Sequence, residues 1–283
     1  MSQGMSLGEK QILEWYLDIG VDECTADAPV NRLSQRPQKD MQEVVQHTNV
    51  QNQNTPLNTV TTFKPVKKSE SPPLGAMEAV QDARKRALQC ETVEDLRLVV
   101  EGFDGCPLKR TAQQTVFEDG NPKARIMILG EAPDTEEDRQ GKPFVGQSGQ
   151  LLDKMFQAIG FSRYAEDLQN ALYLSNIIYW RPPGNRDATD SEIEICRPFV
   201  ERHIELVNPD VLVVLGGMPV KTILRTHQGI TRLRGKWATF KTPNLALEIP
   251  ILPMLHPAFL LKSPDRKKYA WQDLLALKAK FEQ

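Results

Sequence analysis

The chain has few cysteines, no long apolar run and no excess of positive charge. Its four cysteines among 283 residues are far apart, at Cys24, Cys90, Cys106 and Cys196, which argues against a disulfide framework or a compact zinc knuckle. No stretch of about 18 apolar residues occurs, and the start MSQGMSLGEKQILEWYLDIG lacks the pattern of a secretion signal. We therefore expect an intracellular, cytoplasmic protein that makes no membrane contact.

The formal net charge of -2 hides a gradient along the chain. Residues 1–105 contain 11 basic and 16 acidic side chains, whereas residues 106–283 contain 24 and 21. From Arg225 onward, 11 basic side chains stand against 4 acidic ones. A polyanion could therefore bind the C-terminal part of the chain despite the acidic total.

Three regions differ in composition. Within residues 1–27, the stretch Ser6–Ile19 has the apolar spacing of a short amphipathic helix, which is either a docking segment for a protein partner or a clasp on its own chain. Residues 28–73 are rich in Gln, Asn, Thr, Ser and Pro and predict a disordered polar linker. Residues 74–283 have the apolar content of one folded domain.

The folded region alternates between β-rich runs and amphipathic helical stretches. Between the strands, residues 151–159 have helical apolar spacing, and Thr189 with Glu192 forms a capping-box signature for a second helix. This alternation predicts an α/β fold with a mainly parallel sheet covered on both sides, which binds ligands beyond the carboxyl ends of its strands. The expected strands are Arg125–Leu129, Ala171–Ile178, Val211–Leu215 and Ile249–Leu255.

Chemically distinctive residues follow these expected strands. After the first strand, Gly130 allows a sharp turn. Phe144 lies among turn residues, a position that favours stacking on a base over packing in the core. The acidic run nearby is also compatible with a solvated loop. Asn176 offers a donor and an acceptor that match the edge of uracil, but it could equally form a turn.

The last expected strand ends at a histidine that precedes a proline. His256 is held extended by Pro257 and could project into a pocket, although isolated histidines are more often structural. The apolar run 259–261 lies beside a basic loop, which is typical of a wedge that enters a duplex while its neighbours hold phosphates. Packing of these apolar side chains in the core is the alternative.

These segments together match a known family. GEAP, ED, GKPFVGQSGQLLD, SNI with RPPGNRD, EICRPF and LHPAFLL, in this order and spacing, closely resemble the family-4 type of the uracil-DNA glycosylase superfamily. The resemblance covers roughly residues 100 to 283. It implies a three-layer α/β/α sandwich around a four-stranded mainly parallel sheet. It also implies an enzyme that hydrolyses the N-glycosidic bond of a uracil flipped out of DNA, leaving an abasic site.

The resemblance also implies roles in binding uracil. Backbone groups of Gly130, Glu131 and Ala132 would line the pocket. Phe144 would stack on the ring, Asn176 would read its edge, and His256 would stabilise negative charge on uracil O2. The residues expected to contact DNA are Arg181, Arg186, Lys262, Arg266, Lys267 and Lys268.

A different group must orient the attacking water in this chain. Other superfamily members have a water-activating aspartate where this sequence has Ala132. Glu137, Glu131 or Asn185 could replace it, and we favour Glu137 with Asn185.

Two departures from the family pattern matter. Asp134 stands where the family usually has glycine, which puts in question the turn shape and the exclusion of thymine's methyl group. The four cysteines that hold a 4Fe-4S cluster in relatives correspond here to Phe103, Cys106, Trp180 and Cys196. Two thiolates cannot replace four, so we expect no cofactor and an apolar plug at this site.

Two other functions fit the same residues. A non-catalytic reader of uracil-containing or abasic DNA would keep Phe144 and Asn176 and could lose hydrolysis through Ala132 and Asp134. Alternatively, the folded region could serve as a scaffold that the N-terminal helix tethers to replication or repair proteins. Excision of uracil from an oligonucleotide separates the enzyme from the reader, and deletion of residues 1–72 would abolish the scaffold role while sparing excision.

Overall fold

The computed structural model describes residues 74–245 and 247–282, so the predicted N-terminal helix and polar linker lie outside the described residues. The helices are α2 (Leu74–Gln89), α3 (Val93–Glu101), α4 (Thr135–Gln140), α5 (Gln147–Gln157), α6 (Asp190–Val207), α7 (Gly217–Leu224), α8 (Ile230–Leu233), α9 (Pro257–Lys262) and α10 (Lys267–Phe281), with short 3-10 turns η1 (Pro107–Arg110), η2 (Pro183–Asn185) and η3 (Pro264–Arg266). The strands are β1 (Asp119–Gly120), β2 (Ile126–Gly130), β3 (Leu172–Asn176), β4 (Val211–Leu215), β5 (Ala238–Lys241) and β6 (Glu248–Met254).

The described strands form one six-stranded sheet in the order β1-β3-β2-β4-β6-β5. The four inner strands run parallel, and they are the four that the sequence predicts. The expectation of four strands was incomplete, because β1 and β5 each pair antiparallel with an inner strand at an edge of the sheet. β1 has only two residues, which are too few to produce a recognisable pattern.

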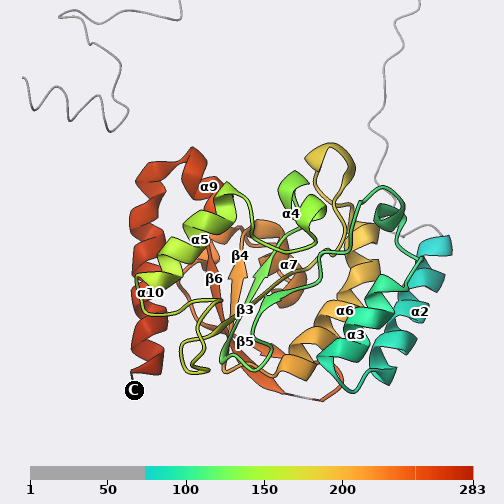
Figure 1. The fold of residues 1–283 in the computed structure, drawn as a ribbon, viewed down its shortest axis with the longest axis horizontal. Coiled ribbons are helices and arrows are strands. Elements are labelled where there is room, and N and C mark those ends of the chain that lie inside the picture. Colours follow the sequence, from blue (N-terminus) through green and yellow to red (C-terminus); the bar gives the residue numbers. More distant parts are fainter. Residues whose placement is uncertain (1–73, 246, 283) are drawn as a thin grey trace, which may run out of the picture. The chain divides into compact units, whose positions relative to one another are not determined.

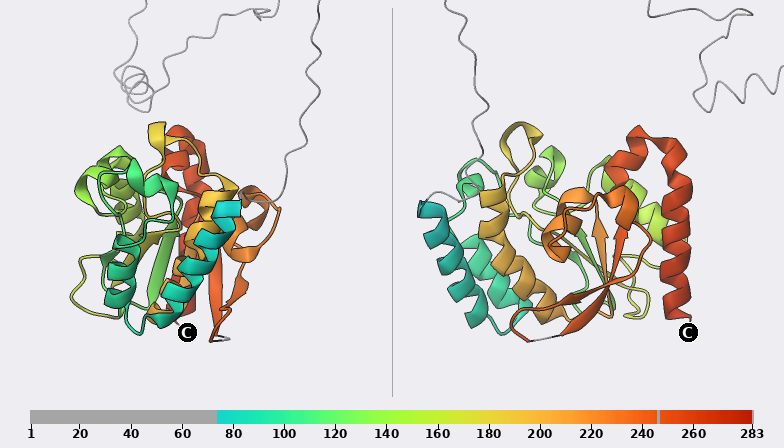
Figure 2. Two further views of the ribbon diagram at one scale, coloured as in Figure 1. Left: turned by 90° about the vertical axis from the view of Figure 1, so that its right-hand side faces the viewer. Right: turned by 180° about the vertical axis from the view of Figure 1, so that it is seen from behind.

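Helices cover both faces of the sheet, which gives the predicted three-layer α/β/α arrangement (Figures 1 and 2). Alternate residues of each strand point to opposite faces. Met127 and Leu129 belong to one apolar cluster, with residues of α2, α3, α6 and α7. Ile126 and Ile128 belong to the other, with residues of α5 and α10. Every position of β2, β3 and β4 is therefore buried, as in other doubly covered parallel sheets.

Local sequence signals set the ends of the helices. The predicted capping box is present, because Thr189 Oγ1 accepts from the Glu192 N–H at 3.3 Å and the Glu192 carboxylate accepts from the Thr189 N–H at 2.8 Å. The helix predicted over 151–159 is α5, and Gly160 beyond its end has a φ of +93°. β2 lies between β3 and β4 in the sheet. The connection from β2 leads to β3 on one side, and the connection from β3 then leads to β4 on the other side. A crevice opens beyond the strand ends where the strand order reverses in this way.

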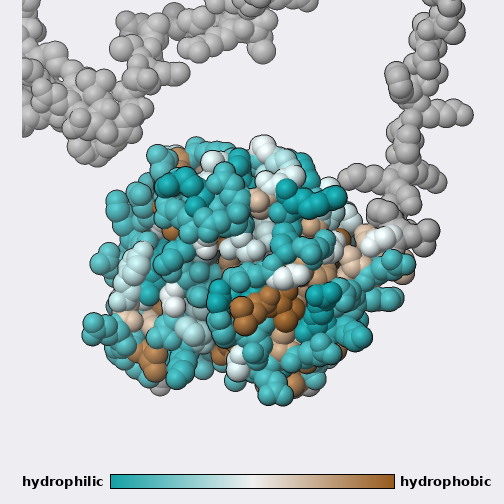
Figure 3. Space-filling model, turned by 45° about the vertical axis from the view of Figure 1, so that its right-hand side comes forward, coloured by the Kyte–Doolittle hydropathy of each residue, from teal (hydrophilic) through white to brown (hydrophobic). Residues whose placement is uncertain are grey.

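The surface shown in Figure 3 is mainly hydrophilic, with a small hydrophobic patch near its centre. Among the described residues, no helix has the length and apolar character needed to cross a bilayer.

Candidate functional site

A cleft of about 510 Å³ opens at the carboxyl-terminal ends of the parallel strands. Its wall comes from the loops that follow β2, β3 and β6, together with α4 and the start of α5. Seven of the eight residues predicted to bind uracil or act on it line this cleft. The lining residues are Glu131, Ala132, Pro133, Asp134, Glu137, Phe144, Ser148, Asn176, Pro182, Asn185, Arg186, Asp187, His256, Ala258 and Lys262.

The eighth residue, Gly130, lets two of these side chains approach each other. A Cβ at Gly130 would lie 2.3 Å from Asn176 Oδ1 and 2.5 Å from Phe144 Cζ, so any larger residue here would displace these two side chains. The rings of Phe144 and His256 have centroids 6.0 Å apart and planes inclined by 29°. The structure therefore brings together the aromatic ring, the amide and the imidazole that the sequence singled out, while their roles toward a base stay predictions.

Asn176 is the last residue of β3 and has an incompletely bonded side chain. It is 2% exposed, and its Nδ2 has no hydrogen-bond partner in the described structure. A buried amide N–H without an acceptor costs roughly 1–3 kcal/mol. A carbonyl oxygen of a ligand in the cleft would supply the missing acceptor.

His256 caps α9 and is held in one tautomer. Its Nδ1 accepts from the Ala258 N–H at 3.2 Å, so in the neutral ring the proton is on Nε2. Burial lowers the pKa of His256 to about 4, and the Asp134 carboxylate opposes this shift. The imidazole is therefore neutral at pH ~7 and offers one N–H donor.

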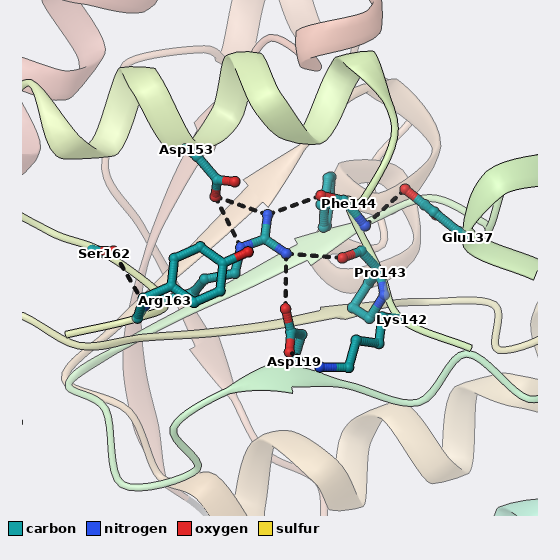
Figure 4. A network of polar contacts seen from close by, with 9 residues as sticks. Asp119, Glu137, Lys142, Pro143, Phe144, Asp153, Ser162 and Arg163 are labelled. Atoms are coloured by element: carbon teal, nitrogen blue, oxygen red, sulfur yellow. Dashed lines mark hydrogen bonds and ion pairs between the residues drawn. The ribbon is translucent and has the colours of Figure 1, made fainter. Parts of the chain in front are cut away.

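Phe144 is both a core residue and a wall of the cleft. It is 2% exposed and shares an apolar cluster with Leu152, so the expectation that it stands apart from the core was wrong. Its backbone has a φ of +56°. The Phe144 N–H donates to Glu137 Oε1 at 2.7 Å, and its carbonyl accepts from Arg163 Nη2 at 3.0 Å (Figure 4). Because Glu137 and Arg163 satisfy the backbone N–H and carbonyl groups of Phe144, this turn residue can be buried in the core.

Asp134 does not adopt the left-handed conformation that the family's glycine suggested. Its φ of -89° and ψ of -172° are extended, so the expected difficulty with turn shape was wrong. Asp134 instead caps α4, because its Oδ1 accepts from the backbone N–H groups of Glu136 at 2.8 Å and Glu137 at 3.0 Å. Asp134 therefore adds a carboxylate to the cleft without backbone strain.

The three residues predicted to orient water all line the cleft. Burial raises the pKa of Glu137 to about 7, the charge of Asp134 adds to the shift, and the bond from the Phe144 N–H opposes it. The Asn176 amide also lowers this pKa, although it makes no hydrogen bond of normal geometry.

Burial raises the pKa of Glu131 as well, and the charge of Asp187 contributes. Asn185 accepts from the Nε of a neighbouring arginine at 2.7 Å, which leaves its amide N–H groups for other partners.

The six predicted DNA-contacting residues do not form one cluster. Arg186 and Lys262 line the cleft, and Arg186 makes two bonds to the Glu192 carboxylate at 2.7 and 2.9 Å. The remaining four do not line the cleft, although Arg181 contacts a residue that does. Arg181 bonds to Asn185 and lies 4.0 Å from Asp138, Arg266 pairs with Asp265 at 3.0 Å, and Lys267 and Lys268 line a separate apolar groove with Trp271.

The apolar run after His256 is divided between core and surface. Leu260 is fully buried, as the core alternative predicted, whereas Phe259 is 43% and Leu261 is 41% exposed. Ala258 and Lys262 of α9 line the cleft, so these two exposed side chains lie on a helix that borders it.

The positions of the relatives' cluster ligands do not fit an iron-sulfur group. Phe103, Cys106, Trp180 and Cys196 are each at most 1% exposed. The two thiols interact, which lowers the pKa of Cys106 and raises that of Cys196. Phe103 meets the ring of Phe199 edge-on at 5.0 Å. Among residues 74–245 and 247–282, no group of three or more His, Cys, Asp or Glu side chains could hold a metal.

The fold and the cleft define an α/β protein with a cleft at the carboxyl-terminal ends of its parallel strands, and comparison identifies its family. Residues 117–275 match the model of the uracil DNA glycosylase superfamily, which is more than half of the chain, so the chain belongs to this superfamily. It is similar to the type-4 uracil-DNA glycosylase of Sulfurisphaera tokodaii, with 34% identity over 188 residues, which are 65% of this chain and 82% of the relative. The enzyme of that name from Archaeoglobus fulgidus is 34% identical over 184 residues, 63% of this chain and 88% of its own.

A larger protein contains a similar region. The DNA polymerase of Bacillus phage SP01 is 29% identical over 163 residues, which are 58% of this chain and 16% of the polymerase.

Proposed function

We propose that this protein hydrolyses the N-glycosidic bond of uracil in DNA and leaves an abasic site. The observation that carries the proposal is the buried, unpaired Nδ2 of Asn176, which lies in one cleft with the Phe144 ring and the His256 imidazole. Uracil O4 would accept from Nδ2, and uracil N3–H would donate to Oδ1. Cytosine presents the reverse pattern and would leave this amide mispaired. The names of the type-4 relatives support the same substrate.

The chemistry needs stabilisation of charge more than transfer of a proton. Cleavage produces an oxocarbenium-like sugar and a uracil anion, and a preorganised donor lowers the energy of such an anion. The Nε2–H of neutral His256 would donate to uracil O2, where the charge develops. Glu137, with Asn185, would orient the attacking water on the sugar, since Ala132 has no carboxylate. Glu137 Oε1 is already bonded to the Phe144 N–H, which would fix the carboxylate in place.

The base must leave the stack before it can reach the cleft, because the glycosidic bond is inaccessible inside a duplex. Exposed Leu261 and Phe259 would fill the space that the base vacates. Lys262 at the cleft, with Arg181, Arg186 and the basic residues 266–268, would hold phosphates.

We also propose that the protein works without an iron-sulfur cluster. Phe103 and Trp180 would occupy with apolar contacts the volume that a cluster fills in relatives, and Cys106 and Cys196 would be structural thiols. A purified protein without the visible absorption of an iron-sulfur centre is the expected result.

An oligonucleotide assay tests the activity directly. Labelled substrates with U:G, U:A, single-stranded uracil and hypoxanthine would show excision and its preferences. Asn176→Ala should lose excision and melt no lower than the wild type, because it removes an amide whose buried N–H has no acceptor and little packing. Asn170→Ala is the matched control, since this exposed amide bonds only to Asp167. A chain that binds uracil-containing or abasic DNA but never cleaves it would be the non-catalytic reader instead.

The stretch Ser6–Ile19 is proposed to bind a protein partner. Deletion of residues 1–72 should remove that interaction and leave excision unchanged. Loss of excision after the deletion would contradict the assignment of the chemistry to the folded region.

A further inference from the structure

We propose that Arg163 is a positioning residue for uracil recognition, because its guanidinium group fixes the backbone on which the Phe144 ring is mounted. The inference rests on the proposed function, since it takes Phe144 as the stacking surface for the base. Arg163 does not line the cleft, so it would act only through Phe144.

The guanidinium group of Arg163 bonds to two consecutive carbonyl groups. Nη1 donates to the Pro143 carbonyl and Nη2 to the Phe144 carbonyl, each at 3.0 Å (Figure 4). The same group is held by Asp153, which accepts from Nε at 2.9 Å, and by Asp119, which accepts from Nη1 at 3.0 Å. The side chain of Arg163 is 1% exposed. Two carboxylates therefore neutralise the buried guanidinium group. Its other N–H groups bond to the backbone of the turn at residues 143–144.

This turn needs external support. Phe144 has a φ of +56°, a conformation that a bulky side chain disfavours and that persists only where neighbouring contacts impose it. Glu137 holds the N–H of Phe144 at 2.7 Å, and Arg163 holds its carbonyl from the other side. A Cβ at Gly149 would lie 1.7 Å from the Phe144 carbonyl oxygen, so glycine there leaves room for the turn. Each peptide group next to Phe144 is thus bonded to a buried ionisable side chain.

Arginine is required for this arrangement. Its planar fork presents several donors in fixed directions, whereas lysine is a point charge on a flexible stem. Lysine at position 163 could keep the ion pairs with Asp119 and Asp153 but could not hold both carbonyl groups in the same way. A residue that only stabilised the fold would have no reason to affect the affinity of the cleft for a base.

The test measures the dissociation constant of free uracil by calorimetry, together with excision kinetics and melting temperature. Base-aromatic stacking predicts that Phe144→Leu weakens uracil binding by about 5- to 50-fold. Arg163→Gln should produce a similar loss, and the double variant should bind no more weakly than either single variant, because both changes remove one stacking interaction. Arg125→Gln is the control, since it breaks an arginine-aspartate pair at the opposite end of β2.

Each outcome decides the proposal. Unchanged uracil affinity in Arg163→Gln, or losses that multiply in the double variant, would overturn it. If Arg163→Gln does not fold, Arg163→Lys carries the test and should weaken uracil binding without losing the fold. A wild-type protein that binds uracil through Phe144 but does not excise it would refute the proposed function and leave the positioning role intact.

Discussion

Replacing Trp180 by alanine tests whether aromatic packing has taken the place of a metal cluster. Trp180 is 1% exposed, its ring meets Tyr179 edge-on at 6.1 Å, and its Nε1 donates to Thr115 Oγ1 at 3.0 Å. Truncation of a fully buried tryptophan costs about 3 to 5 kcal/mol, from lost apolar burial and the cavity left behind. Loss of the bond to Thr115 places the expected value in the upper half of this range.

Thermal and urea unfolding measure this loss. In a domain of this size, each 1 kcal/mol lowers the melting temperature by about 2–4 °C, so Trp180→Ala should melt roughly 8 to 20 °C below the wild type. Excision at a temperature well below the transition should be retained, because Trp180 does not line the cleft.

Trp271→Ala provides the matched control, since this tryptophan is 44% exposed on α10. It should cost less than about 1 kcal/mol. A Trp180→Ala variant as stable as the control would refute the plug, and so would a brown wild-type protein that contains about four irons.

Three further predictions concern the cleft. Because burial raises the pKa of Glu137 from 4.5 to about 7, the stability linked to this group is fully present below about pH 4.5 and is lost as pH rises through 7. Urea unfolding at about pH 5 and pH 8 should therefore show a loss of up to about 3 kcal/mol in the wild type that is absent in Glu137→Gln. His256→Gln should lower kcat by about 100- to 1000-fold, and the ratio to wild type should be the same at about pH 5.5 and pH 8, since His256 is neutral at both. A ratio that shrinks near pH ~6.5 would show that the imidazole titrates as in solution. Leu261→Ala should weaken excision from a U:A duplex by about tenfold and change single-stranded excision little, and equal losses on both substrates would exclude a wedge.

The inner part of the fold was predictable because its signals are local. Each inner strand contains a run of apolar residues, since both faces of the sheet are buried, and in Val211–Leu215 three of the five are also β-branched. The edge strands were missed because β1 has two residues and β5 has four. Their pairing is decided by neighbouring strands rather than by their own composition.

The cleft was predictable because parallel topology collects strand ends at one edge. Asn176 and His256, 80 positions apart, could be placed together on that ground alone. The capping role of Asp134 was also visible in principle, because Asp134 and Glu137 have the spacing of a capping box. Composition instead suggested a solvated acidic loop.

Arg163 could not have been found from the sequence. It belongs to no motif, and a lone arginine in a loop is usually exposed. Its partners Asp119 and Phe144 are 44 and 19 positions away, so the contact exists only after the chain has folded. Long-range polar contacts of this kind have no periodic signature.

His256 connects the cleft to a helix at the surface. It is the cap of α9, and this six-residue helix also presents Leu261 at the surface. A helix of six residues spans less than two turns, so His256 and Leu261 belong to one short segment of the chain. If Leu261 enters a duplex as proposed, any shift of that segment also moves the imidazole that would face the departing base.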